Sequence, residues 1–113
     1  MKKISKPWGS EQILENNAKY VLKKLVMNKN KRCSLQYHKK KRETIFVLAG
    51  KLEVTLGRNI KKLKKKIYKN GDYLTILPKT VHRMKGITKS VYLEASTNQL
   101  KDVVRLSDDF NRK

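Results

Sequence analysis

Short apolar runs separated by turn residues recur along the 113-residue chain. Leu52, Val54 and Leu56 alternate with polar residues, which is the period of two expected for a strand with one buried face. Comparable runs predict further strands, over residues 19–28, 32–38, 43–48, 73–77, 81–84 and 90–95. Because turns rich in Asn and Gly punctuate these runs at regular spacing, the pattern predicts an all-β sandwich or barrel. The length allows one domain, spanning residues 1–113.

The lysine-rich residues 60–68 depart from this pattern. Ile60, Leu63 and Ile67 are spaced three and four apart, as on one face of a helix. A basic amphipathic helix of the kind that binds membrane surfaces or calmodulin is one interpretation. The segment covers barely two helical turns, however, and so short a helix is marginal without packing. We favour a lysine-rich edge strand, because lysines block edge-to-edge pairing of sheets.

The charge is strongly positive, with 29 Lys and Arg against 9 Asp and Glu and a net charge of +20. An excess of this size suggests an anionic partner, such as nucleic acid, a membrane surface or a phosphorylated small molecule. The lysine bias of an AT-rich genome would produce the same charge without any partner. Nucleic-acid binding is disfavoured, because Trp8 and the tyrosines, which could stack on bases, are scattered rather than spaced along one strand face.

The chain lacks the usual signals of export or membrane insertion. No apolar stretch approaches the roughly 20 residues that span a bilayer, so we expect no membrane association. The first residues are basic but no apolar core follows them, so no signal peptide is predicted. The single cysteine, Cys33, cannot form an internal disulfide, which favours a reducing compartment and a cytoplasmic location. We interpret Cys33 as a small core residue; a nucleophilic role would need a nearby base and an electropositive setting.

Four polar residues on the predicted strands form a candidate metal site. Gln36 and His38 are two apart on one strand, so their side chains leave the same face. A hairpin through the basic residues 39–42 would bring Glu43 back beside His38, and His82 follows a later strand. Each residue alone is more often an ordinary surface or core group. Together, two imidazoles, a carboxylate and an amide oxygen on neighbouring strands are a plausible cage for a divalent metal.

The spacing of these residues resembles two motifs of the cupin superfamily. Gln36-Tyr37-His38, with Glu43 and then Gly50, is similar to the first cupin motif, and Gly71-Asp72 with Pro78 and His82 is similar to the second. More narrowly, the chain resembles the cupin domain of type II mannose-6-phosphate isomerases. The shared segments are Lys6-Pro7-Trp8-Gly9-Ser10, Ser34-Leu35-Gln36, Val54-Thr55-Leu56-Gly57, Thr80-Val81-His82-Arg83 and Asp102-Val103-Val104-Arg105. The chain departs from that family at Lys39-Lys40-Lys41, where His-His-Arg is common, and at Met84-Lys85-Gly86.

The resemblance implies a fold, a cofactor and an activity. The fold would be a double-stranded β-helix, the cupin jelly-roll barrel. A divalent metal ion, with zinc as the expected ion, would be held by the Gln36 amide and by His38, Glu43 and His82. The activity would be an aldose–ketose isomerase that converts mannose 6-phosphate to fructose 6-phosphate. A metal-binding cupin of sugar or polysaccharide metabolism with no catalysis, or with another specificity, is the alternative.

Two further expectations concern substrate contacts and assembly. Lys40 is the candidate general base, since desolvation near a metal can lower the pKa of a lysine. Arg83, which follows the candidate ligand His82, would bind the phosphate of the sugar phosphate, and Arg42 is a second candidate for this role. We expect a homodimer, because a small barrel has sheet faces and edges to cover and a two-fold interface is the commonest solution.

Overall fold

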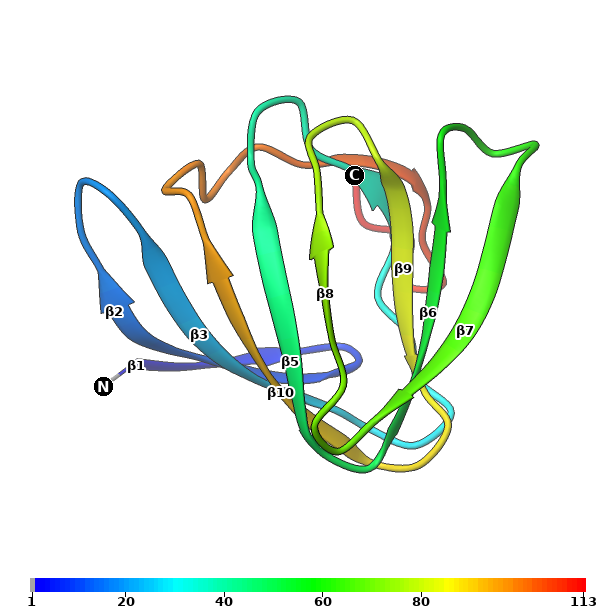
Figure 1. The fold of residues 1–113 in the computed structure, drawn as a ribbon, viewed down its shortest axis with the longest axis horizontal. Helices are drawn as coiled ribbons and strands as arrows, with labels where there is room; N and C mark the ends of the chain where they lie inside the picture. Colours follow the sequence, from blue (N-terminus) through cyan, green and yellow to red (C-terminus); the bar gives the residue numbers. More distant parts are fainter. Residues whose placement is uncertain (1) are drawn as a thin grey trace.

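The computed structural model describes residues 2–113, which form two antiparallel β-sheets that face each other (Figure 1). This part of the chain contains strands, turns and loops, and no helix. The strands are β1 (Lys2–Lys6), β2 (Gly9–Asn16), β3 (Val21–Met27), β4 (Leu35–Tyr37), β5 (Glu43–Ala49), β6 (Lys51–Gly57), β7 (Leu63–Lys69), β8 (Tyr73–Ile76), β9 (Val81–Gly86), β10 (Ser90–Ser96) and β11 (Val104–Ser107). One sheet has the order β1-β2-β3-β10-β5-β8, and the other has the order β11-β4-β9-β6-β7. The predicted all-β barrel is confirmed.

Each predicted run contains a strand, and the lysine-rich segment is an edge strand as expected. β7 pairs with β6 and is the last strand in the order of its sheet. Three strands were not predicted: β1, β2 and β11. They lack the alternating apolar pattern, and their side chains are exposed or half-buried. Pairing with a neighbouring strand, rather than burial of one face, holds them in place.

The apolar core lies between the two sheets. On β3 and β10, and on β5 as far as Val47, every second residue is buried, so these strands present one face to the interior. Fully buried side chains such as Met27, Ile45 and Leu52 fill this space, each contributing roughly 1.5–3 kcal/mol. At one end, buried polar residues replace the apolar ones: Lys23, His38, Lys41, Glu43, His82 and Glu94. The β4–β5 and β8–β9 loops lie at this end, which is uppermost in Figure 1.

The hairpin predicted between residues 32–38 and 43–48 is wrong. β4 pairs with β9 and β11, whereas β5 pairs with β10 and β8 in the other sheet. The connecting residues cross from one sheet to the other because the carboxylate of Asp102 binds them. The backbone N–H groups of Lys39, Lys40 and Lys41 donate to its two oxygens at 2.7–3.0 Å. His38 and Glu43 therefore face each other across the interior instead of standing side by side on one sheet.

No helix within residues 2–113 has the length and apolar character that crossing a membrane requires.

Candidate metal centre

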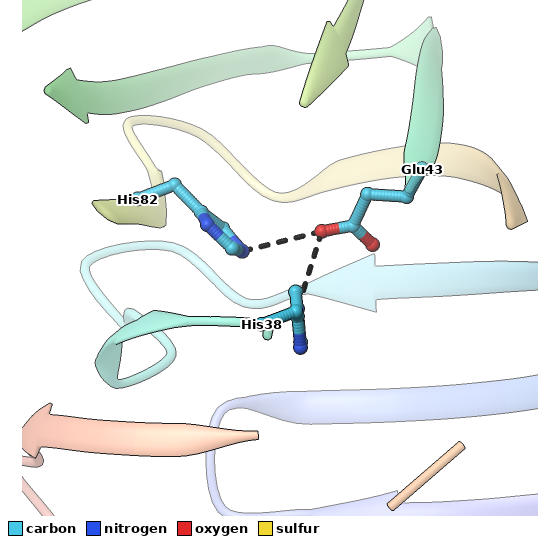
Figure 2. A group of neighbouring side chains, drawn as sticks. All are labelled: His38, Glu43 and His82. Atoms are coloured by element: carbon cyan, nitrogen blue, oxygen red, sulfur yellow. Dashed lines mark ion pairs between the residues drawn. The ribbon is translucent and has the colours of Figure 1, made fainter. Parts of the chain in front are cut away.

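Three buried side chains converge at the polar end of the barrel. His38 follows β4, Glu43 opens β5, and His82 lies on β9. Figure 2 shows both imidazole rings directed at one oxygen of Glu43, at 3.4 Å from His38 Nε2 and 3.2 Å from His82 Nε2 to Glu43 Oε1. The candidate ligand atoms of the three residues all lie within 4.8 Å of one another. Their exposed fractions are 7% for His38, 2% for Glu43 and 0% for His82.

Backbone carbonyls fix the orientation of both rings. His82 Nδ1 donates to the Thr80 carbonyl at 2.9 Å, and His38 Nδ1 donates to the Asp102 carbonyl. A carbonyl oxygen can only accept, so Nδ1 carries a proton in both rings, and Nε2 is the nitrogen that can offer a lone pair to a metal ion. A ring whose Nδ1 is held by a backbone carbonyl while Nε2 points at a possible cation is the arrangement found in metal-ligating histidines.

Two atoms at the centre have no hydrogen-bond partner within the described part of the chain. Glu43 Oε1 and His82 Nε2 are buried and make no hydrogen bond there. The two Nε2 atoms face one oxygen of the Glu43 carboxylate, and a cation bound between them would contact all three atoms. Imidazole nitrogen with carboxylate oxygen is a donor set that suits zinc and several other first-row divalent ions. The residues present therefore fit a divalent metal ion.

Lys41 and Glu94 form a buried ionic cluster with Glu43. Lys41 Nζ lies 3.1 Å from Glu94 Oε2 and 3.6 Å from Glu43 Oε2. Burial by itself would raise the pKa of Glu43, but its contacts with the two imidazoles and the Lys41 ammonium hold that pKa well below its usual range. Burial, together with the nearby Glu43 charge, raises the pKa of Glu94 to about 7 against the effect of Lys41. Lys41 thus binds one oxygen of Glu43 and leaves the other directed at the imidazoles.

A cavity of about 150 Å³ opens beside these residues. That size is similar to an engineered protein cavity that holds one benzene, so it suits a small ligand or one end of a larger one. The cavity is lined by Lys6, Trp8, Glu11, Lys23, Leu25, Cys33, Ser34, Gln36, His38, Lys41, Glu43, His82, Met84, Tyr92, Glu94, Leu100, Val103, Arg105 and Arg112. Gln36 thus lines it together with His38, Glu43 and His82, and is the direct cross-strand neighbour of His82 in the β4–β9 register.

The three residues that the sequence predicted to contact the substrate, Lys40, Arg42 and Arg83, lie outside the cavity lining. The Lys40 side chain is exposed and does not line the cavity, and Arg42 is exposed as well. The Arg83 guanidinium donates to the carbonyls of Cys33 at 2.9 Å and Ser107 at 3.2 Å. Since His82 and Met84 line the cavity, Arg83 between them points to the opposite face of β9, where it lies beside Glu53.

Sequence reasoning missed the charged residues that do line the cavity. Glu94 alternates with the outward-facing Leu93 and Ala95, so strand periodicity could have indicated it, whereas Lys41 lies in the loop before β5, where no such period applies. Arg105 belongs to the short strand β11, for which no alternating pattern exists.

Cys33 is part of the packing around the cavity. It is buried, and its sulfur accepts a hydrogen bond from the Met84 N–H at 3.3 Å. Burial raises the pKa of the Cys33 thiol, which disfavours the thiolate that a nucleophile needs. The structural interpretation of this residue is therefore the one that its surroundings favour.

Solved structures with the same fold include several cupins. KdgF from Halomonas sp. is 14% identical, with a TM-score of 0.78 over 89% of this chain and 91% of that one. An RmlC-like cupin from Shewanella frigidimarina is 16% identical, with a TM-score of 0.76 over 88% of this chain and 86% of that one. The capsular polysaccharide assembling protein CapF from Staphylococcus aureus is 13% identical, with a TM-score of 0.81 over 94% of this chain and 34% of CapF. At these identities the similarity establishes the fold, a cupin jelly roll.

Sequence comparison identifies the family. A search of curated proteins found no significant match. The sequence model of the family described as mannose-6-phosphate isomerase C-terminal matches residues 1–108, nearly the whole chain. The chain therefore belongs to the mannose-6-phosphate isomerase C-terminal family of cupin-type domains.

Proposed function

We propose that the protein is a metal-dependent aldose–ketose isomerase that interconverts mannose 6-phosphate and fructose 6-phosphate. The observation that supports this most is the convergence of His38 Nε2, His82 Nε2 and Glu43 Oε1 at a buried polar cavity, in a chain of this family. His38, Glu43 and His82, with Gln36 as the fourth ligand, would hold the ion, and zinc is the expected one. When bound, such an ion polarises sugar oxygens and stabilises the negative charge that develops during proton transfer.

The isomerisation also needs a group that moves a proton between C1 and C2 of the sugar. Lys40 is exposed and does not line the cavity. Lys41 and Glu94 line the cavity 3.1 Å apart, directly beside Glu43. On position alone, we assign the proton transfer to the Lys41–Glu94 pair in place of Lys40. Both groups are within reach of a ligand that contacts the metal site.

A coupled assay with mannose 6-phosphate tests the activity. The chelated protein should be inactive, and addition of Zn²⁺, Mn²⁺, Fe²⁺ or Ni²⁺ in turn should identify the ion that restores turnover. His38→Ala should abolish turnover, since the ring acts on charge that develops in the transition state. Lys39→Ala, one residue further along and exposed, is the matched control and should retain kcat. Folded, metal-loaded protein that forms no fructose 6-phosphate would refute the isomerase.

The second candidate is a metal-binding cupin that recognises a sugar without isomerising it. In either function a complete hexose phosphate would extend beyond the cavity of about 150 Å³. The two functions differ in one measurement. A binding module would retain mannose 6-phosphate on the metal-loaded protein unchanged, whereas the isomerase would equilibrate it with fructose 6-phosphate.

We also propose a homodimer and a cytoplasmic location. Leu93, Phe46 and Tyr73 are cross-strand neighbours on the outer face of the six-stranded sheet, and Phe46 and Tyr73 are 39% and 70% exposed. In a chain with a net charge of +20, an apolar face is where two copies approach with least repulsion. The lone buried Cys33 suits a reducing compartment.

A further inference from the structure

A third buried atom in the same cavity lacks a partner. Within residues 2–113, the buried side-chain atoms that make no hydrogen bond are Glu43 Oε1, His82 Nε2 and Arg105 Nε. All three residues line the cavity. A metal ion would satisfy the first two, which are acceptors, but Arg105 Nε carries a proton and can only donate. Since a buried donor without an acceptor is destabilising, Arg105 calls for a ligand of its own, one that offers oxygen atoms.

The sheet register places Arg105 close to the metal site. Arg105 on β11 is paired with Gln36 on β4, and Gln36 is paired with His82 on β9. Residues paired in this way share one face of a sheet. Two strand spacings separate the backbones of Arg105 and His82, which is about 10 Å. A single small ligand can therefore contact Arg105 at one end and the metal site at the other.

The charge balance of the cavity also favours an anion at this position. Of the five cations that line it, Lys23 pairs with Glu11, Lys41 with Glu94, and Arg112 with Asp108. Neither of the remaining two, Arg105 and Lys6, forms an ion pair with an Asp or Glu side chain in the described part of the chain. The Arg105 guanidinium is also oriented, because Nη1 donates to a main-chain oxygen of Lys113, the last residue of the sequence, at 2.6 Å.

We propose that Arg105, with Lys6 from the opposite sheet, forms an anion subsite for the phosphate group of a phosphomonoester. Naming the ligand as a sugar phosphate rests on the proposed function, but the subsite itself does not. The arginines expected from sequence are less suited to this role. The donors of Arg83 are directed at backbone carbonyls, and Arg42 is exposed outside the cavity lining.

Binding of inorganic phosphate to the full chain tests the subsite. Trp8 is the single tryptophan and lines the cavity, so its fluorescence reports occupancy. Phosphate, mannose 6-phosphate and unphosphorylated mannose are titrated into chelated and metal-loaded protein. Arg105→Gln should lower the affinity for phosphate and for mannose 6-phosphate at least tenfold, as loss of a charge-assisted contact does. It should leave the metal content unchanged. Arg58→Gln removes the same charge from an exposed arginine that follows β6, and it should change neither the phosphate affinity nor the metal content.

The outcomes separate this inference from the proposed function. Phosphate binding that depends on Arg105, without turnover of mannose 6-phosphate, supports the subsite and refutes the isomerase. Arg105→Lys keeps the charge but not the Nε donor, so it should also weaken the binding of phosphate. It provides the test if Arg105→Gln fails to fold. Wild-type affinity in either folded variant overturns the subsite. Equal losses in Arg58→Gln would also overturn it, because they would show attraction by the net charge alone.

Discussion

Metal binding should stabilise the protein by an amount that the structure predicts. Without an ion, Glu43 Oε1 and His82 Nε2 are buried and make no hydrogen bond within residues 2–113. Each such atom costs about 1–3 kcal/mol, so satisfying both recovers roughly 2–6 kcal/mol. Mass action gives a similar value, about 4 kcal/mol at a free metal concentration of a thousand times Kd. For a chain of this length, that corresponds to a rise in Tm of roughly 15 °C.

The matched variants Glu43→Gln and Glu53→Gln isolate the role of the site. Both remove one negative charge and keep the side-chain volume. Glu53, however, is half-buried on the face of β6 that points away from the metal site. Thermal unfolding is followed by circular dichroism for the chelated protein and again after addition of Zn²⁺. Glu53→Gln should keep the full metal-induced rise in Tm, and Glu43→Gln should lose more than two-thirds of it. An equal rise in both variants, or no rise in the wild type with any divalent metal, would refute the metal centre.

Three other measurements follow from the structure. Lys41→Met should reduce kcat at least a hundredfold in the mannose 6-phosphate assay, whereas Lys40→Met should leave it within about twofold. Hydrogen bonding from Arg112 lowers the pKa of Asp108 to about 2, so this pair stabilises the fold above pH 4 and its contribution is lost as the pH falls through 2. Urea unfolding should therefore show Asp108→Asn to be less stable by up to about 2 kcal/mol at pH 7 and equal to the wild type near pH 2. Phe46→Glu should convert the expected dimer to a monomer in sedimentation at micromolar concentration.

Strand positions could be predicted from the sequence wherever one face of the strand is buried. The alternation of Leu52, Val54 and Leu56 with polar residues reports burial on one side directly. β1 and β2 carry no such signal, because pairing with a neighbour holds them and neither face is deeply buried. The lysines of residues 60–68 fit an edge strand, because such a strand exposes one of its sides to solvent.

Side-chain convergence was predictable in part. Two histidines and a glutamate at motif spacing indicated one constellation, and the structure places their ligand atoms within 4.8 Å of one another. The path of the chain between them was not predictable, because it depends on Asp102, more than 60 residues further along, whose carboxylate binds three backbone N–H groups of the loop. A contact at such separation leaves no local periodicity. For the same reason the sequence did not indicate that Lys41, rather than Lys40, faces the interior.

The charges at this end of the barrel explain why a metal and an anion suit one cavity. Lys41 and Glu94 are buried together, and burial of either alone would leave an uncompensated charge at a cost of several kcal/mol. With Glu43 as the anionic ligand, a divalent ion would leave the centre with excess positive charge, and Arg105 and Lys6 would add to it. A phosphate bound at Arg105 offsets that excess within a cavity of low dielectric, where the attraction is strongest. Each ligand should therefore bind more tightly in the presence of the other, by equal factors as thermodynamic linkage requires.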